Sequence, residues 1–201
     1  VAAFYRDEYG YDVFDYILVA QGEYVEQLYI DVNITILGSC LEDTKVSLGV
    51  SSSEYAAVSI APSTTSGIKA IKNITIEGPT HGIDIDSASS DVIIENVLID
   101  GALKAGILAQ NANSVSIRDV MIRDMAELPN DLSFGIGSEV EQLSLDRVTV
   151  QGARFVGINL LGGETLANQV SILNTAKDTN ADTGIGGLGI MVTDGQFTAN
   201  E

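Results

Sequence analysis

The chain has 201 residues, a length that predicts one domain. Its 28 Asp and Glu residues against 10 Lys and Arg give a formal net charge of −18, which excludes nucleic acid and an anionic membrane surface as main partners, since both require a basic face. With 45% hydrophobic residues and no apolar run near ~18 residues, the sequence predicts a folded core and no membrane span.

Aromatic residues concentrate at the beginning of the chain, and residues 1–27 are the first predicted element. All seven tyrosines lie in the first 55 residues, at positions 5, 9, 11, 16, 24, 29 and 55. One interpretation is an N-terminal cap that leads into the first repeating unit and covers the open end of the fold. The other is an aromatic platform for sugars.

A short motif then repeats along the rest of the chain. After a weaker copy at Asn33, it starts at Asn73, Asn96, Asp119, Arg147 and Gln169, with spacings of 22 to 28 residues. A second motif, Gly followed by Ile, interleaves with the first at Gly82, Gly106, Gly135, Gly157 and Gly189. Repeats of this length are typical of solenoids.

Each repeat contains three short runs in which apolar and polar residues alternate, as in residues 83–85, 92–94 and 97–99. Such alternation predicts strands, and no window shows a convincing helical period. Three strands in one repeat form one turn of a parallel solenoid, in which each strand pairs with its equivalent one coil later. We therefore predict an all-β parallel β-helix of about six coils, spanning residues 1–201 as a single domain.

The turn between the second and third strands carries a stack of polar residues. Asn73 and Asn96 occupy it in two successive units, and Asn tolerates the left-handed backbone that a tight turn requires. The preceding position alternates in charge from coil to coil, with Lys72, Glu95, Arg118 and Asp146. This predicts a surface charge ladder that fixes the register of the strands.

The segment from Asp15 to Ile30, with its Val-Ala-Gln-Gly-Glu-Tyr-Val-Glu run, resembles the first coil of the pectin-lyase-like right-handed parallel β-helix superfamily. The later repeats are similar to that family throughout, and to bacterial secreted β-helix repeat proteins in particular. The resemblance implies a right-handed helix and an extracellular or bacterial cell-surface location. It also implies that any enzyme site lies on the outer face of the first-strand sheet.

Alternation assigns the residues of that outer face. They are Asp84, Asp86, Leu108, Gln110, Gly137, Glu139, Asn159, Leu161 and Met191. The face contains no Arg or Lys of the kind that the resemblance implies for a lyase base. The resemblance also implies two other kinds of enzyme site. The pattern of the superfamily's pectin esterases, paired Asp with a downstream Arg, is not apparent here. The Gly-His-Gly signature of its galacturonan hydrolases is matched only in part, by His81.

An acidic strip on this face has two interpretations. Asp84 and Asp86 lie about 6.6 Å apart along one strand, near the range of the acid–base pair of inverting glycosidases, and Glu139 lies two coils away. The other interpretation is a polar face on an acidic protein. Gln110, Asn159 and His81 are the candidate substrate-binding residues. Because no catalytic set is complete, we favour a non-catalytic extracellular module that presents loops toward carbohydrate or a surface partner. The alternative is a polysaccharide-degrading enzyme that uses Asp84, Asp86 and Glu139.

The connection before Gly189 contains a candidate calcium site. Asp178, Asn180 and Asp182 place three oxygen-bearing side chains at alternate positions, a pattern that suits a hard cation. An ordinary Asp/Asn turn fits the same residues. The last coil presents an unpaired edge, so we expect the chain to be part of a longer one or its end to dock on another surface.

Overall fold

The computed structural model of the protein describes residues 16–48, 56–63, 66–78, 80–88, 90–125, 133–176 and 187–200. Within these ranges every regular element is a β-strand, which confirms the all-β class. None of these residues belongs to a helix that could cross a membrane.

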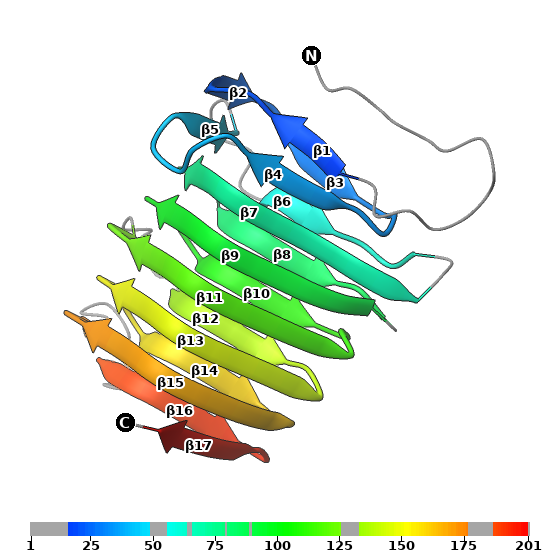
Figure 1. Cartoon of the computed structure of the whole chain (residues 1–201). Helices are drawn as coiled ribbons and strands as arrows, with labels where there is room; N and C mark the ends of the chain where they lie inside the picture. The colour runs from blue at the N-terminus through cyan, green and yellow to red at the C-terminus, as the bar shows by residue number, and fades with distance from the viewer. Residues whose placement is uncertain are drawn as a thin grey trace.

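The strands form two sheets that face each other along the whole molecule (Figure 1). The ten-stranded sheet contains β1 (Tyr16–Val19), β2 (Gly22–Val25), β4 (Thr35–Gly38), β5 (Thr44–Ser47), β7 (Gly67–Glu77), β9 (Ser90–Asp100), β11 (Ser114–Arg123), β13 (Gln142–Gln151), β15 (Glu164–Leu173) and β17 (Gln196–Asn200). The seven-stranded sheet contains β3 (Leu28–Ile30), β6 (Ala56–Ile60), β8 (His81–Asp86), β10 (Ala105–Gln110), β12 (Phe134–Glu139), β14 (Val156–Leu161) and β16 (Leu188–Thr193).

Each strand pairs in parallel with the equivalent strand of the next coil. In the ten-stranded sheet Ile74, Val97, Val120, Val148 and Val170 are successive partners, as the repeat predicts. The seven-stranded sheet is in register at its Gly-Ile motifs, where Ile83, Ile107, Ile136, Ile158 and Ile190 are partners. The predicted parallel solenoid is therefore confirmed.

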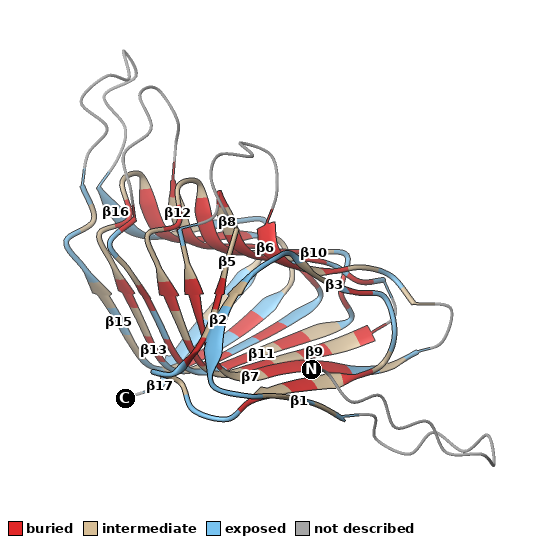
Figure 2. Ribbon diagram, turned by 90° about the horizontal axis from the view of Figure 1, so that it is seen from above, coloured by how far each residue is buried: buried red, intermediate tan, exposed pale blue. Residues whose placement is uncertain are grey.

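The core lies between the two sheets, where their inward side chains meet. Figure 2 shows buried residues, in red, on the strands of both sheets. Ile83, Ile107, Ile136 and Ile158 are completely buried, because each is covered by the coil before it, the coil after it and the facing sheet. In the last coil the equivalent Ile190 is 38% exposed. Stacked β-branched side chains fit the pleated strands and supply most of the hydrophobic stabilisation.

In the central coils the structure differs from the sequence prediction in one respect. The second and third runs of each repeat do not form separate strands but join in one long strand, as in β9 and β11. A single left-handed residue bends each strand, with φ near 52–56° at Asn73, Asn96, Asp119, Arg147 and Gln169. One such residue turns the chain while the pairing continues on both sides, so the two runs remain parts of one strand.

The bend residues contact one another from coil to coil. The Asn96 side-chain Nδ2 donates to Asn73 Oδ1 over 2.9 Å, and Arg147 donates from Nε and Nη2 to the two carboxylate oxygens of Asp119. The bend is therefore a polar ladder as well as a turn, as expected for the two asparagines.

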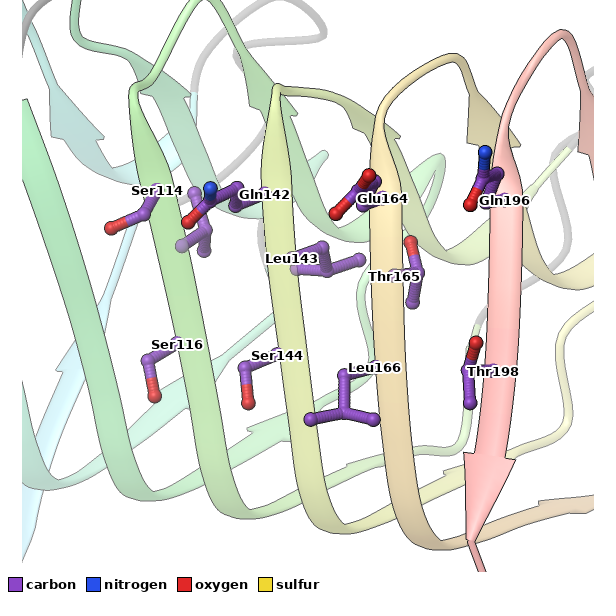
Figure 3. A pocket seen from close by; sticks show the side chains of 11 residues that line it. Ser114, Ser116, Gln142, Leu143, Ser144, Glu164, Thr165, Leu166, Gln196 and Thr198 are labelled. Atoms are coloured by element: carbon purple, nitrogen blue, oxygen red, sulfur yellow. The ribbon is translucent and has the colours of Figure 1, made fainter.

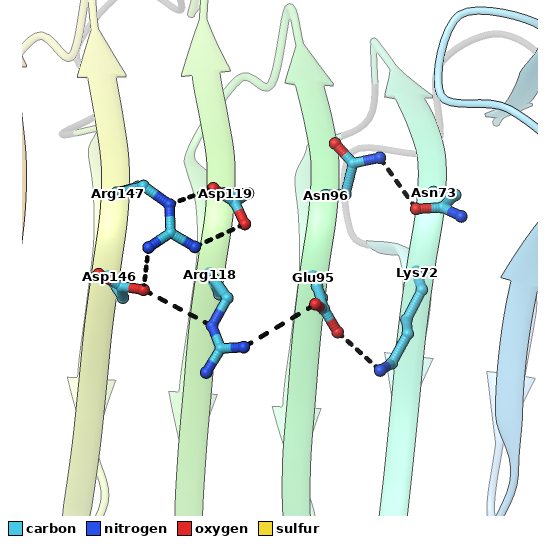
Figure 4. Close-up of polar contacts among 8 residues, drawn as sticks. All are labelled: Lys72, Asn73, Glu95, Asn96, Arg118, Asp119, Asp146 and Arg147. Atoms are coloured by element: carbon cyan, nitrogen blue, oxygen red, sulfur yellow. Dashed lines mark hydrogen bonds and ion pairs between the residues drawn. The ribbon is translucent and has the colours of Figure 1, made fainter.

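The neighbouring charge ladder is also confirmed (Figure 4). Lys72 Nζ lies 2.6 Å from Glu95 Oε2, and Arg118 lies between Glu95 and Asp146 at 4.0 and 3.6 Å. These side chains are partly exposed, so each pair adds little stability. Their alternating sign instead disfavours a slipped register, which would place like charges side by side.

Of the N-terminal aromatic residues, only Tyr16, Tyr24 and Tyr29 lie in the described ranges. Tyr16 and Tyr29 are 51% and 65% exposed, and the Tyr24 hydroxyl donates to the Ala20 carbonyl oxygen over 3.0 Å. The other four tyrosines, Tyr5, Tyr9, Tyr11 and Tyr55, lie outside the described residues. The cap and the sugar platform both stay predictions.

Candidate functional site

The predicted strip lies on the outer face of the seven-stranded sheet. One row of partnered residues contains Asp84, Leu108, Gly137 and Asn159, and the next contains Asp86, Gln110 and Glu139. We call the outward residues of β8, β10, β12 and β14 the acidic face. Their register brings the candidate catalytic and substrate-binding residues of the sequence onto one surface.

Asp84 is the most perturbed carboxyl group of the acidic face. Its side chain is half-buried, and burial raises its pKa above the ordinary value, assisted by Asp86 and opposed by His81. Burial also lowers the pKa of His81, with Asp84 acting in the opposite direction and Lys104 in the same direction. A neutral imidazole beside a carboxyl group of raised pKa can exchange protons with a ligand.

Asp86 has different surroundings, although it lies only two residues along the same strand. Its side chain is exposed, and its Oδ1 accepts a hydrogen bond from Asn111 Nδ2 over 2.9 Å. It borders a groove of about 550 Å³ that Glu139, Glu141 and Leu161 also line. Along the strand the backbone positions of the two aspartates are about 6.6 Å apart, near the carboxyl separation that leaves room for a water molecule in inverting glycosidases.

Asn159 has the most unusual environment on this face. It points outward, as alternation predicts, yet it is only 8% exposed, and its buried Oδ1 accepts no hydrogen bond. Its partner on the preceding strand is Gly137, and Leu108 Cδ1 lies 3.1 Å from the position that a Gly137 Cβ would take. A buried carbonyl oxygen without a donor is costly. The oxygen is covered in this structure, so a ligand hydroxyl satisfies it only when the Asn159 side chain turns outward.

Solved structures with this architecture include enzymes that act on polysaccharides. Pectin methylesterase from carrot superimposes with a TM-score of 0.55 at 13% identity, covering 95% of this chain and 75% of that one. The catalytic domain of a GH87 α-1,3-glucanase, solved with nigerose, gives 0.51 at 14% identity over 91% of this chain and 40% of that one. The chain therefore has the right-handed parallel β-helix fold of these enzymes. The sequence matches no family model and no curated protein.

The acidic face of this β-helix has no cation in its outward rows. Among the outward residues that the structure describes on β8, β10, β12 and β14, none is Lys or Arg, in line with the sequence. Asp84, Asp86 and Glu139 all add negative charge to a protein whose net charge is −18. Such a face repels a polyanion and is compatible with an uncharged ligand.

The predicted calcium ligands cannot be placed on this β-helix. Asp178, Asn180 and Asp182 lie outside the described residues, so calcium at that loop stays a prediction. Within the described part of the chain, no group of three or more His, Cys, Asp and Glu side chains could hold a metal ion. Asp84 lies in one row and Asp86 and Glu139 lie in the next, and the three do not form such a group.

Asp84 should lower the stability of the β-helix at neutral pH. Its folded-state pKa is raised above the unfolded value of 3.8, so stability is lost as the pH rises from there through the folded pKa. We expect Asp84→Asn to raise the melting temperature at pH 7 and to leave it almost unchanged at pH 3. Asp86→Asn, at an exposed position, is the matched control and should raise the melting temperature less at pH 7, because burial of Asp84 is the larger cause of the shift. An Asp84→Asn variant that melts lower than wild type at pH 7 would contradict this assignment.

Proposed function

We propose that this β-helix is an extracellular or bacterial cell-surface protein that binds a polysaccharide along its acidic face. The observation that carries the proposal is the buried, unpartnered Oδ1 of Asn159 in the same row as Asp84. From β8 to β14 the row spans three strand steps, about 14 Å, enough for several sugar units side by side. Polysaccharides are also what the pectin methylesterase and glucanase of this fold act on.

The charge of the face determines which polysaccharide it accepts. Because its outward carboxylates have no counter-charge in the same rows, we expect a neutral glycan rather than a polyuronate. Sugar hydroxyls would donate to Asn159 Oδ1 and to the carboxylates, while Gln110 can both donate and accept. In this form the protein is a rigid, non-catalytic scaffold that holds the chain across its coils.

Removal of the Asn159 amide tests the proposal. Asn159→Ala should weaken binding of a neutral gluco-oligosaccharide about five- to tenfold, the effect of one lost hydrogen bond. Its melting temperature should not fall, because the substitution removes an unsatisfied buried oxygen. Gln151→Ala, an amide outside the acidic face, is the control. Isothermal titration calorimetry with oligosaccharides of α- and β-linked glucose and with polygalacturonate measures the difference. Preferred binding of polygalacturonate, or equal affinities of the two variants, would contradict the proposal.

A second candidate function is glycoside hydrolysis, which the contrast between Asp84 and Asp86 favours. In an inverting reaction, Asp84 as the protonated acid would donate its proton to the glycosidic oxygen as that bond to the anomeric carbon breaks. Asp86, or Glu139, would take a proton from the water whose oxygen bonds to the same carbon. Both Asp84→Asn and Asp86→Asn would then abolish the release of reducing sugar. If wild-type protein binds the glycan and releases none, the binding function alone remains.

A further inference from the structure

A second groove lies on the outer face of the other sheet, across β11, β13, β15 and β17 (Figure 3). Its volume is about 560 Å³. We call it the serine–glutamine groove, after the outward residues that line it: Ser114, Ser116, Gln142, Ser144, Glu164, Leu166, Gln196 and Thr198. None of them belongs to the acidic face, which is on the opposite sheet.

The groove consists of two parallel rows of side chains. Ser114, Gln142, Glu164 and Gln196 are successive partners in one row. Ser116, Ser144, Leu166 and Thr198 are partners in the other. Each row advances by one strand spacing, about 4.8 Å, per coil, and the two rows are about 6.6 Å apart. A ligand that contacts both rows over four coils must be extended and must run across the strands.

The polar groups of this groove have few partners within the protein. Ser114 Oγ donates to Asp91 Oδ1 over 2.7 Å. The side chains of Ser116, Ser144 and Gln142 form no hydrogen bond with any residue that the structure describes. The charge ladder on the same strands, with Arg118 and Asp146, is paired throughout. The groove therefore offers its donors and acceptors to a ligand, whereas the ladder beside it does not.

The chemistry of the lining identifies one class of ligand. Hydroxyl and amide groups both donate and accept hydrogen bonds, as sugar hydroxyls do. Leu166 is 49% exposed in the middle of the groove and offers an apolar contact to the C–H face of a sugar. A surface that binds a protein usually presents several aromatic or apolar anchors. Leu166 is the one large apolar side chain among these outward residues, so the groove suits a glycan better than a protein. Glu164 and the net charge of −18 disfavour an acidic glycan.

We propose that the serine–glutamine groove is a second glycan-binding site, which holds a neutral polysaccharide chain along the axis of the β-helix. It does not depend on the acidic face, because the two faces belong to different sheets. Two sites on opposite sides of one rigid scaffold would let the protein bridge two chains, or bind one polymer more tightly through multivalency.

The test uses variants of β13, which contains both groove and control positions. The double variant Gln142→Ala/Ser144→Ala removes one polar side chain from each row of the groove. Thr149→Ala/Gln151→Ala is the matched control, because both residues are uncharged and outward on the same strand but outside the groove. All proteins also carry Asn159→Ala, which weakens the acidic face, so that the two proposals succeed or fail separately. The probes are neutral α- and β-linked gluco-oligosaccharides, with polygalacturonate as the anionic comparison.

We expect the Asn159→Ala protein to retain binding of a neutral gluco-oligosaccharide. Adding the groove substitutions Gln142→Ala/Ser144→Ala should weaken that binding at least fivefold. The control pair should leave it unchanged, and polygalacturonate should bind more weakly than the neutral probe. The proposal is overturned if Asn159→Ala alone abolishes all binding. Equal affinities of the groove and control pairs, or preferred binding of polygalacturonate, would overturn it as well.

Discussion

Gly106→Ala should destabilise the protein by about 1–3 kcal/mol or more, as overpacking in a filled core does. A Cβ on Gly106 would lie 2.6 Å from Ile122 Cγ2 and 2.7 Å from the carbonyl oxygen of Gly135 in the next coil. Ile122 is completely buried, and the Gly135 backbone belongs to a paired strand, so neither can move aside cheaply. A shift of the urea denaturation midpoint to lower concentration measures the effect.

Gly189→Ala is the matched control for this prediction. Gly189 begins the same Gly-Ile motif in β16, the last strand of the seven-stranded sheet, and nothing lies within 4 Å of the position that its Cβ would take. The expected change is within about 0.5 kcal/mol, as for ordinary surface substitutions. Equal stability of Gly106→Ala and Gly189→Ala would contradict the claim that the two sheets approach too closely at Gly106 to admit a Cβ.

Lys69 should show the second large effect, because its side chain is completely buried. Its ammonium group donates to the carbonyl oxygen of Ala61 and, over 2.8 Å, to Ser87 Oγ. Lys69→Ala would leave a cavity and should cost about 2–5 kcal/mol. Lys69→Met keeps most of the volume without the buried charge and should be neutral or stabilising, since Ser87 Oγ still donates to Ala61.

The pH dependence provides a second readout for Lys69. Burial lowers its pKa below the ordinary value of 10.5, opposed by Asp31. Between the folded pKa and 10.5 the unfolded chain binds more protons, so wild-type stability should rise with pH in that window. Lys69→Met should lack this rise. If Lys69→Met is destabilised as much as Lys69→Ala, the ammonium contacts themselves hold the coil together.

The pair of Lys69 and Ser87 also shows why distance alone does not define a catalytic site. A lysine of lowered pKa beside a serine hydroxyl meets the distance criterion for a nucleophile and its base. Both side chains are completely buried, however, so no substrate can reach them. Their hydrogen bonds join Lys69 of β7 to Ala61 and Ser87, which follow β6 and β8.

The repeating features of the fold could be predicted from the sequence because each is periodic. Alternation identified the buried rows through Ile74 and Ile83, and the sign pattern from Lys72 to Asp146 predicted the charge ladder. Lys69 was not predicted, since it occupies a position whose partners in the next coils are Val92, Val115 and Leu143. A lysine inside such a row is an exception that only its buried partners explain.

The candidate site was predictable in position but not in environment. The sequence placed Asp84 and Asn159 on one outer face, and their register confirms the rows. It could not show that Asp84 is half-buried or that Asn159 Oδ1 is buried without a donor, because burial of an outward residue depends on side chains far away in the sequence. The serine–glutamine groove was missed because single Ser and Gln residues have no pattern until neighbouring coils align them.

The most direct test of carbohydrate binding on the acidic face is to map backbone amide chemical shifts while a neutral gluco-oligosaccharide is titrated into the protein. The Gln142→Ala/Ser144→Ala variant is the protein to use, because its second groove is weakened. We predict shifts that cluster on β8, β10, β12 and β14, around Asp84, Gln110 and Asn159. Saturable binding that leaves the amides of these four strands unshifted would contradict the proposed function.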